Sequence, residues 1–373
     1  SRAAIRPSLA GLRRNSMPWA RPVMALKLLL QAASGKKTSQ IPIWLMRQAG
    51  RYLPEYRSIR RQNKNFLDMC YSPEVAYEIT MQPIKRFDFD AAILFSDILV
   101  LPHALGVNVE FIENIGPKLE IVQSLNDLQK LTGNLSEEKF SNFLQPVFDV
   151  ITMLKDNLAD DKTLIGFAGS PWTVATYMME GGSSKNFANI KLYMYNHPDE
   201  FAEFLNILAD YTAIYLLKQI ESGADIVKLF DSWAGVLSKK EYENYVIAPN
   251  RRIIQAIRNK YPDFPIIGFP KNSGIYYPKY VDETSVNVLA VDQNIAIDWI
   301  DNNIRDNVAL QGNLDPILLF SEKERIEEYL SNIFSKVSVG RPYIFNLGHG
   351  VLPKTPVDNV KFLVDYVKNH RRK

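Results

Sequence analysis

The sequence predicts a single α/β domain, a (β/α)8 barrel of the TIM type with an inserted β-hairpin, and three observations support this fold class. Short apolar runs, rich in β-branched or aromatic residues, recur along the chain and end in polar or glycine-containing segments. Longer segments with helical periodicity separate most of these runs, as in a parallel sheet with crossover helices. No glycine-rich dinucleotide-binding turn follows any run, which weighs against the alternative, a doubly wound open sheet.

The apolar runs predict eight buried strands, the number that closes a barrel. In chain order, the runs are Ile41–Met46, Ala91–Phe95, Thr163–Phe167, Asp225–Phe230, Pro265–Phe269, Val286–Val291, Val308–Leu310 and Tyr343–Asn346. Because the strands of such a barrel end at one face, we expect the segments that follow the runs to share one mouth.

Helices are indicated by their caps and by their apolar faces. One helix is predicted from Pro73 to about Phe87, with Ser72 as its cap and Pro73 in its first position. A second follows Pro198 and Asp199, and a third lies near the C-terminus. Their apolar faces are formed by Phe201, Phe204, Leu205, Leu208 and Tyr211 in the second helix, and by Val357, Val360, Leu363, Val364 and Val367 in the third.

The inserted hairpin is predicted at Val107–Val122. Apolar and polar residues alternate there on both sides of Asn114–Pro117, a segment whose asparagine, glycine and proline are typical of a turn. No internal repeat and no linker that would divide the chain is visible, so we expect one barrel domain over residues 23–373.

The composition indicates a soluble globular protein and excludes several kinds of partner. The chain has 373 residues, of which 46% are hydrophobic and 23% are charged. No apolar run is long enough to span a membrane, and a net charge of +3 is too small to indicate nucleic acid binding. The single cysteine, Cys70, excludes an intramolecular disulfide and any metal or iron–sulfur site built from several cysteines.

Residues 1–22 differ from the rest of the chain. They contain serines, alanines and no acidic residue, together with Arg2, Arg6, Arg13, Arg14 and Arg21. This composition suits an organelle transit segment, which would place the protein in a plastid or another organelle. A disordered basic arm or a leftover of expression is an equally good interpretation, and the protein would then be cytoplasmic.

The stretch Met46–Arg57 predicts a binding site for carboxylates. Arg47 and Arg51 leave the end of the first apolar run, with Gly50 between them to let the backbone turn or approach a ligand. Arginine presents a planar fork of donors that matches a carboxylate and keeps its charge. Further basic residues follow at Arg60, Arg61 and Lys64. A solvated basic loop is the alternative, but we expect a substrate that carries several carboxylates.

Asp97 stands out because apolar residues flank it on both sides. A lone carboxylate in such surroundings is costly to bury unless other groups donate hydrogen bonds to it. An internal salt bridge with an arginine or a helix cap would explain it structurally. A role in a site is the alternative that we favour.

Several other expected strand ends also carry polar groups. These are Gly169–Pro171, Asp231–Ser232, Lys271, Asp292–Gln293, Asn313 and His349. Each alone is most simply a strand meeting water, but the whole set at one mouth indicates a site. His349 lies between two glycines, and we expect its imidazole to face a ligand.

Five motifs resemble those of the uroporphyrinogen decarboxylase family, and they occur in the family's order. They are Met46–Arg57, Phe95–Leu99, Gly169–Thr173 with Thr176–Met178, Leu229–Gly235, and Asn346–Gly350. The resemblance runs from about Ala25 to near the C-terminus. One departure is Trp233, which stands where a histidine is common in the family.

The resemblance implies a lyase of haem or chlorophyll synthesis that needs no cofactor and no metal. Its members remove the four acetate carboxyls of uroporphyrinogen III to give coproporphyrinogen III. Asp97 would accept hydrogen bonds from the pyrrole N–H groups and stabilise a ring cation, and Arg47 is a candidate for the proton donor. The residues implied in substrate binding are Arg47, Gln48, Ala49, Gly50, Arg51, Arg60, Asp97, Tyr177, Ser232 and His349. A homodimer with facing barrel mouths is implied as well, without nucleic acid or membrane partners.

Two other functions remain open at this point. A non-catalytic tetrapyrrole carrier could keep the arginines but would have little reason to keep Asp97, Tyr177 and His349 together. A related zinc-dependent methyltransferase would need histidine and cysteine ligands in a group. The histidines and the single cysteine lie apart in the sequence, at His103, His197, His349, His370 and Cys70, and do not favour that function.

Overall fold

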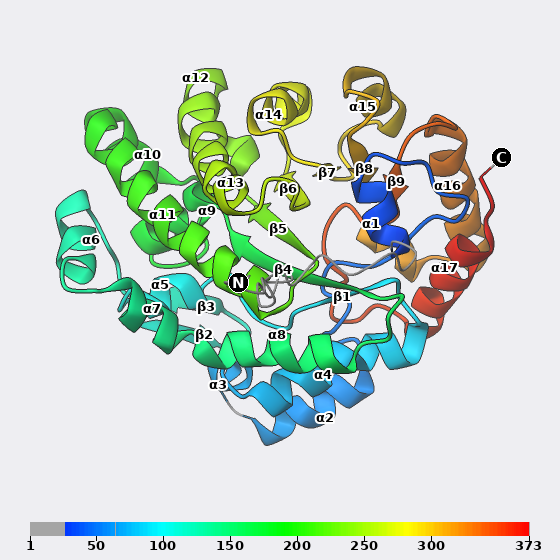
Figure 1. The fold of residues 1–373 in the computed structure, drawn as a ribbon, viewed down its shortest axis with the longest axis horizontal. Helices are drawn as coiled ribbons and strands as arrows, with labels where there is room; N and C mark the ends of the chain where they lie inside the picture. Colours follow the sequence, from blue (N-terminus) through cyan, green and yellow to red (C-terminus); the bar gives the residue numbers. More distant parts are fainter. Residues whose placement is uncertain (1–26, 64, 373) are drawn as a thin grey trace, which may run out of the picture.

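The computed structural model describes residues 27–63 and 65–372, and its main feature is a curved parallel sheet. The seven strands lie in the order β1-β4-β5-β6-β7-β8-β9, with helices on the outside (Figure 1). The strands are β1 (Ala91–Ile93), β4 (Thr163–Gly169), β5 (Ile226–Asp231), β6 (Ile266–Pro270), β7 (Val288–Ala290), β8 (Ala309–Gln311) and β9 (Tyr343–Ile344). This arrangement confirms the predicted barrel of the TIM type. The basic leader at residues 1–22 lies outside the described residues.

The gap between β9 and β1 is filled by the segment predicted as the first strand. Ile41–Met46 is buried, but it forms only an isolated parallel bridge, between Ile43 and Phe345. The N–H of Phe345 donates to the carbonyl of Pro42 (2.8 Å), and the N–H of Asp90 donates to the carbonyl of Ile43 (3.0 Å). The prediction of a regular strand here is therefore wrong. Pro42 has no N–H to give a ladder, and the Asp90 carboxylate takes the N–H of Ile43 (2.8 Å).

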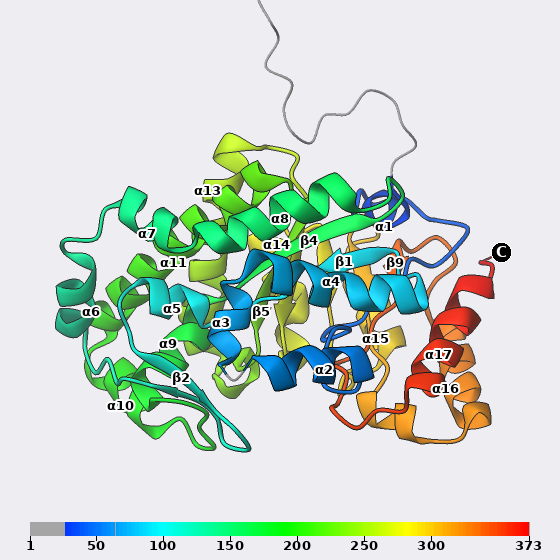
Figure 2. The same ribbon diagram turned by 90° about the horizontal axis from the view of Figure 1, so that it is seen from below.

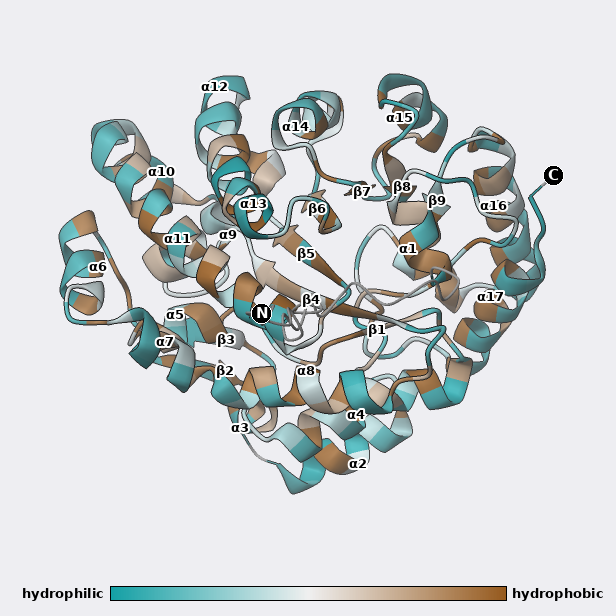
Figure 3. Cartoon of the chain, in the orientation of Figure 1, coloured by the Kyte–Doolittle hydropathy of each residue, from teal (hydrophilic) through white to brown (hydrophobic). Residues whose placement is uncertain are grey.

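Helices form an outer ring around the strands, and in Figure 3 the strands are mainly brown while the helices combine brown and teal residues. An amphipathic helix packs its apolar side on a sheet in this way. The helices are α1 (Leu28–Ala33), α2 (Pro54–Gln62), α3 (Phe66–Cys70), α4 (Pro73–Phe87), α5 (Val100–Ala104), α6 (Leu125–Thr132), α7 (Glu137–Phe143), α8 (Gln145–Asn157), α9 (Pro171–Glu180), α10 (Ala188–Asn196), α11 (Pro198–Ser222), α12 (Lys239–Tyr242), α13 (Ala248–Lys260), α14 (Tyr277–Thr284), α15 (Ile297–Asn303), α16 (Lys323–Lys336) and α17 (Val357–Asn369). Within the described ranges, none of these helices is long and apolar enough to cross a membrane.

The three predicted helices are confirmed as α4, α11 and α17. Helix α4 begins at Pro73 and ends at Phe87, with Ser72 in the cap position, although the Ser72 side chain makes no capping hydrogen bond. Most residues of the predicted apolar faces of α11 and α17 are buried. Burial of these faces against the barrel, more than helix propensity, holds the outer ring in place.

The predicted hairpin is also confirmed, as strands β2 (Val109–Ile112) and β3 (Gly116–Leu119). They pair antiparallel, and the turn between them uses positive φ angles at Asn114 (64°) and Gly116 (103°). The base of the hairpin is tied to the end of α9, since the N–H of Leu119 donates to the carbonyl of Gly181 (3.0 Å). The hairpin is thereby fixed beside the barrel mouth.

The barrel interior is filled by a compact apolar cluster rather than by a channel. It is formed by inward side chains of the strands, with Trp44 and Met46 from the irregular segment. Helix α1 closes one end of the barrel with Leu29, Ala32 and Ala33, which are all buried in this cluster. Figure 2 shows α1 and the pair formed by α2 and the hairpin on opposite sides of the molecule. The open end is therefore the end that carries α2 and the hairpin.

Candidate active site at the barrel mouth

A cavity of about 1210 Å³ opens at the C-terminal ends of the strands, between α2 and the hairpin. Nine of the predicted site residues line it, namely Arg47, Ala49, Gly50, Arg51, Arg60, Asp97, Tyr177, Ser232 and His349. Residues that are far apart in the sequence are brought together because parallel strands end at one face. The cavity is large enough for a ligand well above the size of an amino acid.

Gln48 is the one predicted site residue that does not line the cavity. Its side-chain carbonyl accepts the N–H of Leu45 (3.0 Å), and its amide donates to the carbonyl of Ala91 (3.0 Å). Its backbone carbonyl accepts the hydroxyl of Tyr52 (2.7 Å). Gln48 thus braces the turn that carries the arginines, and its role in substrate binding stays a prediction.

Arg47 is held in an uncommon backbone conformation at the end of the irregular segment. Its φ angle is 59°, in the left-handed region that non-glycine residues rarely adopt. The preceding residue is fixed on both sides, since the N–H of Met46 donates to Oδ1 of Asn346 (3.1 Å) and its carbonyl accepts the N–H of Val351 (2.9 Å). Strained backbone that the surroundings impose is typical of functional sites. The loop that carries His349 therefore sets the position of Arg47.

The charges that line the cavity are mainly positive. Arg47, Arg51, Arg60 and Arg61 face two carboxylates, those of Asp97 and Glu113. Arg51 and Arg61 are exposed, so their guanidinium groups are available to a ligand. Arg61, which the sequence showed only as extra basic character, is thus a further lining residue. A cavity with this charge favours a ligand with several carboxylates.

Asp97 lies in the cavity wall, in the connection between β1 and α5. One oxygen of its carboxylate accepts the N–H of Leu99 (2.8 Å), a local turn bond. Burial raises the pKa of Asp97 to about 6, against the lowering effects of the Leu99 bond and of Arg47. Among the described residues, no basic side chain lies within salt-bridge distance of Asp97. The carboxylate is therefore neither neutralised by an ion pair nor fully used by the turn.

Tyr177 is supported by Trp233, the residue that departs from the family pattern. Their ring centroids are 4.3 Å apart, and the carbonyl of Trp233 accepts the indole N–H of Trp172 (2.9 Å). Burial raises the pKa of Tyr177 to about 12, so its hydroxyl remains a donor at neutral pH. The tryptophan thus takes a supporting position that the sequence alone did not assign.

Ser232 follows a buried polar network at the end of β5. The Asp231 carboxylate accepts the hydroxyl of Thr173 (2.5 Å) and the amide of Asn250 (3.3 Å). The N–H of Trp233 donates to the hydroxyl of Thr173 (3.3 Å). Asp231 therefore holds the turn after β5 through hydrogen bonds inside the protein, while Ser232 faces the cavity.

His349 faces the cavity as predicted, from the loop after β9. Burial, together with the positive charges of Lys271, Arg47 and Lys228, lowers its pKa to about 4. The imidazole is therefore neutral at neutral pH, with one donor and one acceptor to offer a ligand.

Other expected strand-end residues serve the fold instead. Asp292 accepts the N–H of Asn272 (2.9 Å), and the amide of Asn313 donates to the carbonyl of Asp292 (2.8 Å). The hydroxyl of Ser170 donates to Asn250 (2.8 Å) and is fully buried. The sequence could not distinguish these structural residues from residues that face a ligand, because both kinds are polar residues that follow a strand.

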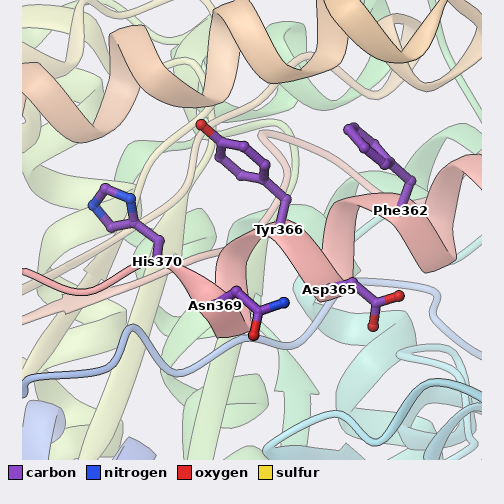
Figure 4. A pocket seen from close by; sticks show the side chains of 5 residues that line it. All are labelled: Phe362, Asp365, Tyr366, Asn369 and His370. Atoms are coloured by element: carbon purple, nitrogen blue, oxygen red, sulfur yellow. The ribbon is translucent and has the colours of Figure 1, made fainter.

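A second, smaller hollow of about 400 Å³ lies on α17, away from the mouth. Figure 4 shows Phe362, Tyr366 and His370 on one side of this helix, with Asp365 and Asn369 pointing elsewhere. The Tyr366 hydroxyl bonds to Ser331 (2.7 Å), which ties α17 to α16. This hollow has no convergent polar groups, so the barrel mouth is the better candidate site.

A zinc site has no ligand set in the part of the chain that the structure describes. No three histidine, cysteine or acidic side chains gather there in a way that could hold a metal ion. Cys70 is buried, and burial raises its pKa well above the ordinary value. The soft ligands that a thiol-methylating zinc enzyme requires are therefore not assembled in the described residues.

Fold and cavity together define a (β/α)8-barrel protein with a deep, arginine-lined pocket at the C-terminal ends of its strands. A model of the family described as Uroporphyrinogen decarboxylase (URO-D) matches residues 24–370. This chain belongs to the uroporphyrinogen decarboxylase family, and the resemblance seen in its motifs is confirmed.

Individual relatives agree with this assignment. A uroporphyrinogen decarboxylase of Rickettsia felis is 47% identical over 338 residues, which cover 91% of this chain and 96% of the relative. One of Rickettsia canadensis is 47% identical over 347 residues, covering 93% of this chain and all of the relative (100%). Among solved structures, a methyltransferase from Methanosarcina mazei has a TM-score of 0.74 at 18% identity and covers 91% of this chain and 97% of its own. At that identity the likeness bears on the fold alone.

Proposed function

We propose that this protein removes the four acetate carboxyls of uroporphyrinogen III to give coproporphyrinogen III, in porphyrin and haem synthesis. The observation that carries the proposal is Asp97, a buried carboxylate without an ion pair in the wall of a cavity whose lining charges are mainly arginines. A simple carboxylate-binding pocket would gain nothing from an anion in its wall. An anion is useful there if the ligand also carries N–H donors and becomes cationic during reaction.

The chemistry explains why both signs of charge are present. Loss of CO₂ from an acetate side chain leaves an electron pair, and many decarboxylases direct it into an organic or metal cofactor. A pyrrole can accept the pair itself once a ring carbon has been protonated. The C–C bond to the carboxylate then breaks, its electrons neutralise the ring cation, and CO₂ leaves. A proton added to the exocyclic carbon and a proton lost from the ring complete a methyl group.

The cavity residues fit distinct parts of this reaction. Arg47, Arg51 and Arg60 bind substrate carboxylates through charge-assisted hydrogen bonds. Asp97 gathers the pyrrole N–H groups and stabilises the ring cation, with the Tyr177 hydroxyl and Ser232 as further donors to an acetate. Arg47 is a candidate for the proton donor, although a guanidinium is a weak acid.

The reaction as proposed needs no cofactor, because the substrate supplies its own electron sink. Purified protein incubated anaerobically with uroporphyrinogen III should yield porphyrinogens with progressively fewer carboxyls. Exhaustive chelation should leave the rate unchanged. Binding without turnover would indicate a carrier, and activity lost on chelation and restored by zinc would favour a methyltransferase-like metal site.

A homodimer with facing mouths is part of the proposal. Three exposed isoleucines lie in connections at the mouth end, namely Ile115 (74% exposed) in the hairpin turn, Ile275 (73%) after β6 and Ile317 (60%) after β8. Apolar groups at a rim are typical of an interface, and a facing copy would shield bound substrate from water. A monomer mass that does not change with concentration would contradict this assembly.

We also propose that residues 1–22 form a separate basic leader that precedes the barrel domain. The family match begins at residue 24, after the arginines of this segment. Deleting the leader should leave the melting temperature and turnover unchanged. A reporter fused to the leader tests whether it directs a protein to a plastid or another organelle, and a diffuse cytosolic signal would contradict targeting.

A further inference from the structure

The proposed mechanism makes no use of Lys228, a lysine in the interior of the barrel. It lies in the middle of β5, where Ile226 and Phe230 are its inward neighbours. Its side chain is fully buried, with a relative exposure of 0%. Lysine is rarely buried without a partner, because removing its charge from water is costly. Lys228 therefore requires an explanation beyond packing.

The amine of Lys228 is surrounded by aromatic rings and a sulfur atom. Its Nζ donates to Sδ of Met46 at 3.1 Å. It lies over the rings of Trp44, Phe230 and Phe269, at 4.9, 4.4 and 4.6 Å from their centroids. Ring faces attract a cation, so this cage can accept an ammonium group even without a carboxylate.

One layer of side chains separates this amine from the candidate active site. Met46, Phe230 and Phe269 touch Lys228 and also line the cavity. The charge of Lys228 also acts on the mouth, since it contributes to the lowered pKa of His349. A charge at Lys228 therefore acts directly on whatever fills the cavity.

When the cavity holds no ligand, the positive charges on neighbouring elements disfavour the protonated form of Lys228. Arg47 and Lys271 follow the irregular segment and β6, and His349 follows β9. Three acids lie at the same strand ends, Asp97, Asp231 and Asp292, but none forms an ion pair with Lys228, and no salt bridge of Lys228 occurs within the described ranges. Burial lowers the pKa of Lys228 well below its ordinary value. The amine thus has a cage that accepts its charge but lacks a counter-ion.

We propose that Lys228 is a specificity-determining residue whose counter-ion is the substrate itself: its amine takes up a proton as a polycarboxylate fills the cavity above it. This inference rests on the proposed function, because that function supplies a ligand with many carboxylates. The bound carboxylates lie beyond a single layer of side chains, so they favour the ammonium form. By linkage, the protonated amine strengthens their binding in return. Lys228 would do this without touching the substrate.

The decisive experiment counts the protons taken up on binding. Coproporphyrinogen III, which has no acetate left to lose, is titrated calorimetrically into the full chain under anaerobic, reducing conditions. Buffers of different ionisation enthalpy give the number of protons at each pH between about 6 and 9. We expect wild type to take up more protons per bound ligand than Lys228→Met does. At some pH in this range the difference should approach about one proton. The difference isolates Lys228 from His349, Asp97 and Asp231, which are present in both proteins.

Affinity and stability provide two further readouts. Lys228→Met should bind coproporphyrinogen III about tenfold more weakly and raise KM for uroporphyrinogen III, with little change in kcat. Its melting temperature should not fall, since methionine suits an apolar interior. Lys228→Gln serves if the methionine variant does not fold. Lys162→Met is the control for loss of a buried lysine far from the mouth, because Lys162 is also buried (5% exposed) but pairs with Asp88 and lies before β4, at the other end of the barrel.

The outcomes separate this inference from the proposed function. Equal proton uptake in wild type and both Lys228 variants would overturn the inference, as would a lower melting temperature with unchanged affinity. In either case wild-type turnover of uroporphyrinogen III would leave the proposed function intact. Wild-type protein that neither binds nor decarboxylates a porphyrinogen would overturn both.

Discussion

Gly350 lies directly against the side chain of Arg47. A Cβ atom added at Gly350 would stand 2.5 Å from Cδ, 2.8 Å from Cγ and 3.1 Å from Nε of Arg47. The neighbouring glycine, Gly348, is just as close to Gln293. These glycines leave room for the arginine and for the turn, and so they explain why His349 has no bulky neighbours in the sequence.

Replacing Gly350 by alanine should therefore displace Arg47 without unfolding the protein. The added methyl group overlaps the arginine stem, while the backbone of Arg47 is fixed by hydrogen bonds on either side of Met46. A displacement of about 1 Å in a positioned group costs up to roughly 10²-fold in rate. We expect kcat/KM for uroporphyrinogen III to fall about 10- to 100-fold, with a near-normal melting temperature.

The matched control is Gly340→Ala. No atom lies within 4 Å of a Cβ added at Gly340, so kinetics and stability should stay at the wild-type level. Normal kcat/KM in Gly350→Ala would mean that the arginine moves aside freely and that its present position is not required.

Trp233 should contribute to substrate binding through Tyr177. Replacing it by alanine removes the ring that lies 4.3 Å from the Tyr177 ring and lets the phenol rotate. Aromatic contacts of this kind contribute about 0.5–1.5 kcal/mol, so we expect KM to rise about three- to tenfold, with a smaller change for Trp233→Phe. Trp299→Ala, a half-buried tryptophan on α15, is the control for general loss of packing. Equal kinetic effects in both alanine variants would contradict a specific role for Trp233.

The pH dependence of kcat/KM should reflect Asp97. Its pKa is raised to about 6 by burial, and the proposed mechanism needs the ionised form. Below that pH the carboxyl is protonated in the free enzyme, so kcat/KM should decrease as the pH falls through about 6. Bound pyrrole N–H groups favour the carboxylate, so the acid limb of kcat should lie at lower pH. The residual activity of Asp97→Asn should lack this limb, and a limb that persists would assign it to another group.

Sequence periodicity predicted most of the barrel because each strand is a short apolar run that must be buried. Periodicity did not predict the structure of the irregular segment, Ile41–Met46. Its hydrophobicity is that of a strand, but Pro42 and the side chain of Asp90 decide its hydrogen bonds, and Asp90 lies far away in the sequence. Tertiary contacts of this kind leave no local pattern.

Residues with an unusual local setting could be predicted for the site, and residues inside ordinary patterns could not. Arg47 and Asp97 were apparent because charges interrupt apolar sequence. Gln48 is buried and makes hydrogen bonds within the protein that its position in the motif did not indicate, and its role in substrate binding stays a prediction. Lys228 lies inside a run that is otherwise typical of a buried strand, and only the packed barrel shows that it is caged below the mouth.

The role of Asp97 can be tested by separating catalysis from stability. Asp97→Asn keeps the shape and can still accept the Leu99 N–H, but it removes the charge and adds an NH₂ group that faces other donors. Losing a preorganised charge from such a site costs roughly 10²–10³ in kcat. Asp97→Glu keeps the charge one methylene further out and should retain more activity than the amide.

The thermal stability of Asp97→Asn should not fall with its kcat. The folded pKa of Asp97, about 6, lies above its ordinary value of 3.8, so its protonated form is favoured in the folded state. The stability that this contributes is fully present below about pH 4 and is lost as the pH rises through about 6. At neutral pH, Asp97→Asn should therefore melt at the wild-type temperature or above it, and any gain should disappear in acid. A structural salt bridge would produce the reverse, a sharply lower melting temperature with a near-normal rate for the enzyme that remains folded. Thermal unfolding and turnover measured on the same samples across this pH range distinguish the two roles.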